Sequence, residues 1–434
     1  QTRAIFANAE IGWKSMIYLT ATGRNDWDSR LAFSDYKSFF YPSIGLSAIL
    51  TSMFNAPDWL TYLKVRGSYT EVGNSYGRFM TTVTYPYDEQ TQSWTSTSSY
   101  PNTKLKPERT KSWEVGLDAR ILNDISLNLT YYRSNTYNQT FYADLSLSSG
   151  YSNIPIQSGN IMNEGLEMSL GYNKQWKDFS FNTNYTLTWN KNRVKRLADG
   201  VYNYATGQPI QMPELSPLTY GHTDARLILR VGGSMGDVYG QRLLKRDLNG
   251  YILNEEGVGL AMENKETYLG SILPKMNMGW SLGFGYKGVD LGMTFTGRFG
   301  GIVISETQSV LDAAGVSKVS ADVRDAGGVQ INQSKVSAQT YYQTIQGTAA
   351  YYTYSATNVR LGELSLSYTL PKKWFDNKVG MTVGLVGKNL WMIYCKAPFD
   401  PELTTSAASN FYQGFDAYML PSTRNFGFNV KFQF

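Results

Sequence analysis

The residues able to carry out chemistry are few in this chain of 434 residues, and they do not form a complete catalytic pattern. His222 is the single histidine, and Asp224 follows two positions later. Ser216 or Ser234 could complete a hydrolytic triad by residue type alone. A lone histidine in a long polar segment is usually a surface residue, and we interpret it so. The scarcity of histidine argues against an enzyme, so we predict no catalytic residues.

Two glycine-containing segments resemble ligand-binding loops but lack required residues. Gly-Gly-Ser-Met-Gly at 232–236 has no Lys-Ser or Lys-Thr ending and no helical pattern after it, so we interpret it as a loop bend. Asp-Leu-Asn-Gly-Tyr at 247–251 has Tyr251 where a calcium loop needs an oxygen ligand, and Val258 where it needs glutamate. A hairpin turn is favoured there, with calcium as the alternative. Cys395 is the only cysteine, which excludes an internal disulfide and a cysteine metal cluster. We predict no metal and no cofactor.

The elements that position these residues are strands, and the clearest of them is the segment 425–434. Apolar and polar residues alternate in it without exception. One face can therefore meet hydrocarbon while the other meets a wet interior, as a transmembrane β-barrel strand requires. We predict that this strand closes a barrel with an apolar face made of Phe426, Phe428, Val430, Phe432 and Phe434.

The same alternation recurs along the chain and predicts about twelve strands, with a candidate thirteenth at about 3–10. Short connections are expected near 53–58, 121–124, 173–178, 286–289 and 371–378. They alternate with long polar ones near 22–41, 73–106, 138–160, 194–274, 300–356 and 392–422. Bacterial barrels have short periplasmic turns and long extracellular loops, so we place every long loop outside the cell. The pattern slips at Gly362-Glu363, which predicts a β-bulge.

Composition agrees with an all-β membrane protein. Gly (40), Tyr (32), Phe (20) and Trp (10) are abundant, and only 17% of the residues are charged, which suits strands and turns better than helical bundles. No apolar run is long enough for a membrane helix, so a membrane span must be built of strands. The net charge of +5 comes without a basic cluster interleaved with aromatics, which argues against nucleic acid as a partner. A soluble β-sandwich is the alternative, but it would not alternate long and short connections so regularly.

Several spaced segments resemble, in order, the C-terminal part of SusC/RagA-type TonB-dependent outer-membrane transporters. They are 19–27 (LTATGRNDW), 40–47 (FYPSIGLS), 59–69 (WLTYLKVRGSY), 105–117 (LKPERTKSWEVGL), 159–167 (GNIMNEGLE), 270–275 (GSILPK), 359–371 (VRLGELSLSYTLP), 387–391 (GKNLW) and 421–424 (PSTR). The resemblance covers essentially the whole chain.

This resemblance implies an all-β fold, a transmembrane antiparallel barrel of about 22 strands with an N-terminal plug. Residues 1–434 would be roughly its last 12–13 strands, with long extracellular loops. The plug, a TonB box and the first strands do not occur in the sequence, and a half barrel would leave open strand edges in lipid. We therefore expect the remaining barrel half and the plug to come from an earlier part of the same polypeptide or from a second chain.

The resemblance also implies location in the outer membrane of a Gram-negative bacterium, in contact with membrane lipid. Import would be energised by TonB–ExbB–ExbD and assisted by a SusD-like surface lipoprotein that acts as a lid. The cargo would be oligosaccharides or peptides. A non-transporting receptor or adhesin barrel is the alternative function.

Two groups of aromatic residues are candidate surface contacts. Trp13, Trp59, Trp113, Trp189, Trp280 and Trp391 fall mostly at strand ends, and we interpret them as the aromatic girdle at the lipid interfaces. Aromatics of the long loops are candidate substrate contacts, because sugar rings stack on aromatic planes. Packing against the lid lipoprotein and packing within the loops are the alternatives. These residues are Tyr85, Tyr87, Trp94, Tyr100, Tyr341, Tyr342, Tyr351, Tyr352 and Tyr354.

The polar residues expected on the inner face of the barrel carry charges of both signs. This mixture suits neutral cargo, and it equally suits a wall that holds the plug. The residues are Glu114, Asp118, Arg120, Asn128, Glu167, Asn182, Asn184 and Asn190.

Overall fold

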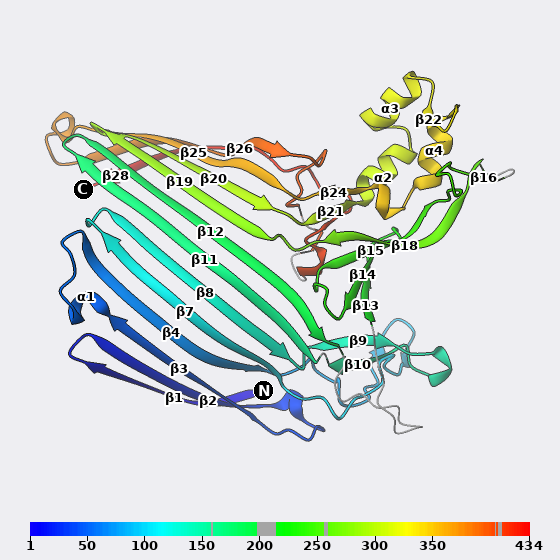
Figure 1. Ribbon diagram of the computed structural model, residues 1–434, viewed down its shortest axis with the longest axis horizontal. Helices are drawn as coiled ribbons and strands as arrows, with labels where there is room; N and C mark the ends of the chain where they lie inside the picture. Colours follow the sequence, from blue (N-terminus) through cyan, green and yellow to red (C-terminus); the bar gives the residue numbers. More distant parts are fainter. Residues whose placement is uncertain (158, 198–213, 256–258, 404, 407–409) are drawn as a thin grey trace. The chain divides into compact units, whose positions relative to one another are not determined.

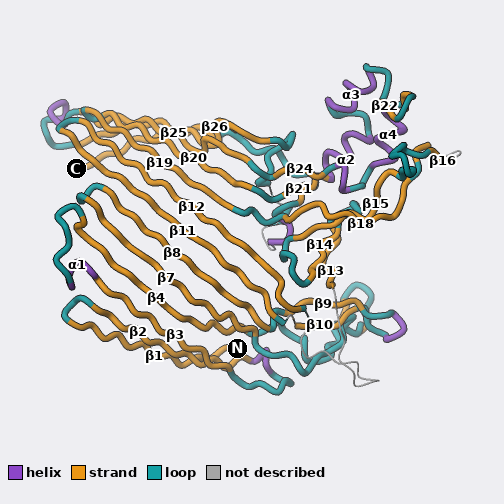
Figure 2. The backbone as a smooth tube through the Cα atoms, viewed as in Figure 1, coloured by secondary structure: helices purple, strands orange, loops and turns teal. Residues whose placement is uncertain are grey.

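The computed structural model describes residues 1–157, 159–197, 214–255, 259–403, 405–406 and 410–434. The chain divides into two units, residues 1–217 with 229–234 and residues 218–228 with 235–434. Long antiparallel strands dominate each unit (Figure 1, Figure 2). Among the described residues these long strands number thirteen. The expected thirteenth strand near the start of the chain is therefore confirmed.

In its described residues the first unit has eight long strands, each hydrogen-bonded to the next in chain order. They are β1 (Thr2–Trp13), β2 (Ile17–Asp28), β3 (Phe39–Ile49), β4 (Leu60–Asn74), β7 (Glu108–Ile121), β8 (Ile125–Tyr137), β11 (Asn160–Trp176) and β12 (Phe179–Arg196). Shorter elements lie between them: η1 (Ser29–Leu31), α1 (Leu50–Met53), β5 (Tyr87–Asp88), β6 (Ser93–Trp94), β9 (Thr140–Asp144), η2 (Leu147–Ser149) and β10 (Asn153–Gln157).

The register of these strand pairs places apolar residues opposite apolar residues and polar residues opposite polar ones. In the β7–β8 pair, Leu117 lies opposite Leu129 and Ala119 opposite Leu127 on one face. Asp118 lies opposite Asn128 on the other face. Because side chains alternate faces along a strand, the period-two sequence pattern produces one apolar and one polar surface.

The short connections of this unit lie near the predicted positions, but their lengths differ from the prediction in both directions: the one expected near 53–58 spans 50–59, whereas the one expected near 173–178 is shorter. The β11–β12 hairpin turns at residues 177–178 alone, since β11 continues to Trp176. The β7–β8 loop has three residues, 122–124, and begins with a turn in which Leu122 and Asn123 have positive φ and the Asp124 N–H donates to the Ile121 carbonyl. Positive φ at both central positions defines the mirror-image turn whose twist fits the flanking strands. All short connections of this unit lie at one end of its strands, on the left in Figure 1, and the long ones lie at the other.

The described part of the second unit has five long strands. They are β19 (Met276–Tyr286), β20 (Val289–Phe299), β25 (Asn358–Leu370), β26 (Gly380–Cys395) and β28 (Asn425–Gln433). In the β20–β25 pair, Thr294 is opposite Glu363 and Phe295 is opposite Leu361, so Gly362 has no partner. The predicted bulge is confirmed. It lets Leu361 and Leu364 point to the same face although their positions differ by three, which in a regular strand would put them on opposite faces.

The strand β28 pairs antiparallel with β26. Phe428 lies opposite Leu385, Val430 opposite Val383 and Phe432 opposite Met381. All nine residues of β28 are exposed, which leaves the apolar face predicted for this strand uncovered. Phe434 follows immediately after the strand. The role of β28 in closing a barrel stays a prediction.

The two longest loops carry folded structure where the sequence pattern predicted polar loops. Their elements are β13 (Glu214–Thr219), β14 (Arg226–Arg230), β15 (Asp237–Leu244), β16 (Asn254–Glu255), β17 (Gly259–Leu260), β18 (Met262–Ser271), β21 (Ile302–Ser305), α2 (Glu306–Ala313), α3 (Lys318–Asp325), β22 (Val329–Ile331), β23 (Ser334–Val336), α4 (Ala338–Ile345), η3 (Ala349–Tyr351) and β24 (Thr353–Ser355). Two further 3₁₀ turns and a short strand complete the unit: η4 (Lys372–Phe375), η5 (Asn410–Tyr412) and β27 (Phe415–Asp416).

Each of the three α-helices in the second unit begins with a serine cap. Ser305, Ser317 and Ser337 accept hydrogen bonds from the backbone N–H groups three residues later. Such caps satisfy donors that a short helix otherwise leaves unpaired. α4 buries Tyr342 and Ile345 in a cluster with Leu244, Leu260 and Tyr352, and Val323 of α3 packs against it. The described part of the chain has no helix long and apolar enough to cross a membrane.

Candidate functional site

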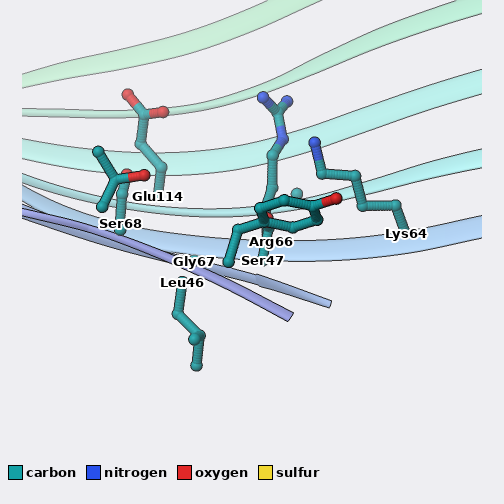
Figure 3. Close-up of a pocket in the computed structure, with 11 residues that line it drawn as sticks. Leu46, Ser47, Lys64, Arg66, Gly67, Ser68 and Glu114 are labelled. Carbon is teal, nitrogen blue, oxygen red and sulfur yellow. The ribbon is translucent and has the colours of Figure 1, made fainter. Parts of the chain in front are cut away.

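A polar groove lies on the inner face of the first unit, over β2, β3, β4 and β7. Its volume is about 160 Å³. Ser47, Lys64, Arg66, Ser68 and Glu114 project from neighbouring strands to the same side of the sheet, whereas Leu46 points to the opposite side (Figure 3). Polar side chains therefore line the groove on one face of the sheet, and the neighbouring apolar side chain lies on the other face.

Arg66 connects three strands through this groove. Its Nη2 donates to Thr130 Oγ1 of β8 at 2.5 Å, and its Nε lies 4.0 Å from Asp118 Oδ2 of β7. Asn128 also donates to Asp118. Space for the guanidinium comes from Gly116, where a Cβ atom would overlap the Arg66 side chain. The network holds a cation and an anion side by side on the inner wall.

Further hydrogen bonds between side chains run across this face toward β12. Asn190 donates to Tyr132 Oη at 2.8 Å, and Ser169 donates to Asn184 Oδ1 at 3.0 Å. Of the predicted inner-face residues, Asp118 and Asn128 bond to each other, whereas Asn184 bonds to Ser169 and Asn190 to Tyr132 of neighbouring strands. Lys64 and Arg66 were missed as inner-face residues, although the alternation of Lys64, Arg66 and Ser68 with apolar neighbours is visible in the sequence.

The first group of loop aromatics includes exposed rings on a small hairpin. Tyr87 of β5 faces Trp94 of β6, with ring centroids 5.1 Å apart. Tyr85, Tyr87 and Trp94 are 62%, 49% and 71% exposed. Tyr100 instead packs edge-on against Tyr151 at 5.1 Å. The hairpin therefore presents aromatic surface to the outside.

The second group is built into the helical part of the other unit. Tyr342 and Tyr352 are 7% and 3% exposed and belong to one apolar cluster, against which Tyr341 and Tyr351 pack. Burial raises the pKa of the Tyr352 hydroxyl above its usual value. Tyr354 packs edge-on against Phe399 at 5.6 Å. Packing within the loops, one of the alternatives left open by the sequence, accounts for these positions.

His222 and Asp224 do not form a catalytic pair. His222 is largely exposed, as expected, and its Nδ1 lies 2.9 Å from Glu306 Oε1. The Asp224 carboxylate accepts backbone N–H groups from Gln241, Arg242 and Ala349 at 2.7–3.0 Å. The role of Asp224 is to fix these backbone segments. Within the described residues, no group of three His, Cys, Asp or Glu side chains could hold a metal ion.

The two glycine-containing segments form turns. Gly232 N–H donates to the Val194 carbonyl and Val194 N–H donates to the Gly233 carbonyl, both at 2.8 Å, so this bend pairs with the end of β12. Asp247 Oδ1 accepts N–H groups of Asn249 and Tyr251 at 2.9 and 2.8 Å. Its carboxylate is thus used to close the turn. Val258, the residue at the calcium-loop end position, lies outside the described residues.

The tryptophans are exposed, but most of them do not fall at strand ends as the sequence analysis expected. Trp13 ends β1 and Trp59 precedes β4, whereas Trp113, Trp189, Trp280 and Trp391 lie inside their strands. For Trp113, Trp189 and Trp391 the reason is strand length. β7, β12 and β26 have 14, 18 and 16 residues, more than the 9–11 or so that cross a bilayer. A tryptophan at a membrane boundary can therefore lie within such a strand, and the girdle stays a prediction.

Comparison with known proteins shows which family has this architecture. Residues 1–390 match the family described as TonB dependent receptor-like, beta-barrel. The chain belongs to this family of TonB-dependent outer-membrane receptors, and its location is the outer membrane of Gram-negative bacteria.

Its relatives include TonB-dependent receptor P3 of Formosa agariphila, 25% identical over 99% of this chain and 45% of that protein. TonB-dependent receptor SusC of Bacteroides thetaiotaomicron is 27% identical over 154 residues, 35% of this chain and 14% of that protein. In fold, the chain is similar to the RagAB peptide importer in its open-open state. The TM-score is 0.74 at 20% identity, over 100% of this chain and 47% of that one. The chain spans about half the length of the curated relatives that it matches over its whole length.

Proposed function

We propose that this chain forms the C-terminal barrel wall of a TonB-dependent importer of oligosaccharides or peptides. The observation that carries the proposal is the two-faced sheet, apolar outside and hydrogen-bonded inside, in a member of a TonB-dependent receptor family. In this proposal the wall works with the remaining strands and a plug. A surface lipoprotein of the SusD type covers its extracellular mouth.

The inner face carries charges of both signs. This supports a wall that contacts polar material without preferring anionic or cationic cargo. Arg66 is balanced by Asp118, and Lys64 shares the groove with Glu114. An inner wall of this kind can hold the polar surface of a plug domain, and it can line a path for neutral cargo. A strongly charged cargo would instead require an excess of the opposite charge.

The exposed hairpin 87–94 supports a role of the loops in capturing substrate. Tyr87 and Trp94 present a paired aromatic surface of the kind that sugar rings and peptide side chains contact. In the proposal, Tyr85, Tyr87 and Trp94 meet substrate or the lid lipoprotein first. The buried Tyr342 and Tyr352 support the fold of their own loop.

Uptake by the intact protein with and without TonB tests the proposal. A fluorescent oligosaccharide and a fluorescent peptide are supplied to cells that express the protein as their only importer for these compounds. We expect uptake of at least one of them to stop when TonB is deleted and surface binding to remain. Uptake that continues without TonB would contradict active import, and binding without any uptake would favour a receptor or adhesin.

Purification from the native membrane tests the partner. We expect a lipoprotein to copurify in a fixed ratio and to dissociate when the hairpin 87–94 is deleted. A protein that purifies alone from mild detergent and imports substrate alone would contradict the need for a lid.

A further inference from the structure

The outward face of the first unit changes from apolar to charged near the end of β7 and β8 that carries the long loops, which we take as the extracellular end. Between the short turn and that point, the outward residues of both strands are apolar. They run from Ile121 to Trp113 in β7 and from Ile125 to Tyr131 in β8. The rings of Trp113 and Tyr131 lie 5.4 Å apart. The next outward residues are Lys111 and Arg133. The apolar face therefore gives way to cations within two residues.

The same change occurs on the neighbouring strands, which lie side by side in Figure 1. Outward Tyr69 of β4 is followed by Glu71, and outward Trp189 of β12 is followed by Lys191 and then Arg193. In β11, Glu164 lies directly between Arg133 and Lys191 in register. We call this set the charged band: Glu71, Arg109, Lys111, Arg133, Glu164, Lys191 and Arg193.

The charged band has five cations and two carboxylates. Glu71 pairs with Arg109 at 3.1 Å and with Lys111 at 3.4 Å, and Glu164 pairs with Lys191 at 3.7 Å. Over the described residues, Arg133 and Arg193 have no carboxylate within ion-pair distance. Exposed ion pairs are weak, so the paired lysines can also turn toward another anion.

Position decides what this excess positive charge meets. Aromatic belts mark the boundary between hydrocarbon and headgroups, so outward residues directly above the belt lie in the headgroup layer. Arginine binds phosphate with its planar fork of N–H donors. We propose that the charged band binds the phosphorylated headgroup of a lipid in the outer leaflet, with Arg133 and Arg193 as the main contacts.

Sheet geometry allows a single headgroup to use several of these cations. Neighbouring strands are about 4.8 Å apart, so Arg133 and Lys191, two strands apart, arise from points separated by roughly 10 Å. Their long side chains can converge on a headgroup with two phosphates. Such binding fixes the depth and tilt of this part of the barrel wall in the membrane.

The test uses the full-length protein in phosphatidylcholine nanodiscs that contain either diphosphoryl lipid A or its phosphate-free form. Lipid A retained by the protein is measured by native mass spectrometry. We expect the wild type to retain the diphosphoryl form and not the phosphate-free form. Because each basic residue strengthens binding to an anionic surface by about fivefold, R133Q/R193Q should weaken retention by roughly 25-fold at low salt. The difference should shrink as salt is raised.

A matched control is R120Q/K177Q, which removes the same charge from the inner face of β7 and from the β11–β12 turn. It should retain lipid A like the wild type. Equal unfolding temperatures in pure phosphatidylcholine show that both variants are folded. Wild-type retention by R133Q/R193Q, or equal retention of phosphate-free lipid, would overturn the proposal. Displacement of lipid A by millimolar inorganic phosphate would show a free anion site rather than a lipid site, and would also overturn it.

Discussion

Arg360, near the first residue of β25, forms a two-pronged ion pair with Asp400 of the loop between β26 and β28. Its Nη1 and Nη2 donate to the two carboxylate oxygens at 2.9 and 2.7 Å. Both side chains are about nine-tenths buried, and Nη2 also lies 3.3 Å from Glu402 Oε2. The pair fastens a long loop to the barrel wall.

Removing one partner of this pair should loosen the loop. D400N leaves the Arg360 charge buried without its main partner, and breaking a buried pair in this way costs about 3–5 kcal/mol. We expect faster hydrogen exchange in residues 396–403 of the variant, while the central parts of β25 and β26 keep their protection. Unchanged exchange in the loop would show that Glu402 replaces Asp400.

The same pair predicts a pH dependence. Burial alone would raise the pKa of Asp400, but hydrogen bonds and the charge of Arg360 outweigh burial and hold the pKa below its usual value. A carboxyl whose folded-state pKa is depressed adds stability above its unfolded pKa, near 3.9, and loses it as pH falls through the folded value. Loop protection in the wild type should therefore persist at pH 5 and decline below about pH 4. D400N should lack this decline.

The two faces of β28 should differ in how much a lysine destabilises the protein. F428K places an ammonium on the apolar face, where lysine near the membrane midplane costs about 2–4 kcal/mol. N429K places it one residue along on the other face, in register with Gly384, and should cost less than 1 kcal/mol. Urea unfolding of the intact protein in lipid vesicles measures both. Equal losses would show that the apolar face of β28 does not meet lipid.

Gly116 should be essential for the Arg66 network. An alanine Cβ would overlap the Arg66 side chain and displace it from Thr130, and overpacking of this kind costs about 1–3 kcal/mol. G67A is the matched control, because a Cβ there meets its nearest atom at an ordinary 3.8 Å. Unfolding free energies compare the two variants. A G116A protein as stable as G67A would mean that Arg66 has another equally good position.

The exposed hairpin should contribute to capture of substrate or of the lid, not to folding. We expect W94A to weaken binding of the transported compound or of the lipoprotein by about tenfold, the loss of roughly 1.4 kcal/mol of contact energy. F33A removes another exposed ring, from a different loop of the same unit, and should leave this binding intact. Calorimetric titration on the intact protein measures both. Similar losses in W94A and F33A would mean that the loops act through general hydrophobicity.

Much of the barrel wall could be predicted from local sequence, because strand faces follow from a period of two. Three features follow from local sequence without long-range information. They are the placement of Leu117 and Asp118 on opposite faces, the apolar face of β28 and the bulge at Gly362. Serine caps such as Ser305 with Gln308 also contain a helix signal that the strand-based interpretation passed over. Helices of eight residues are short enough for polar loop composition to obscure them.

What only the tertiary structure decided is which neighbours each side chain meets. Tyr352 and Trp94 are both loop aromatics in the sequence, yet one is buried in a cluster and the other is exposed on a hairpin. Arg66 and Asp118 meet because β4 and β7 pair across a long loop, and Arg133, Glu164 and Lys191 align only through the register of three strands. The sequence by itself determined the two faces of the wall, since alternation is a property of one strand. The tertiary structure decided the Arg66 network, the charged band and the burial of loop side chains such as Tyr352. These depend on register and on which distant segments pack together.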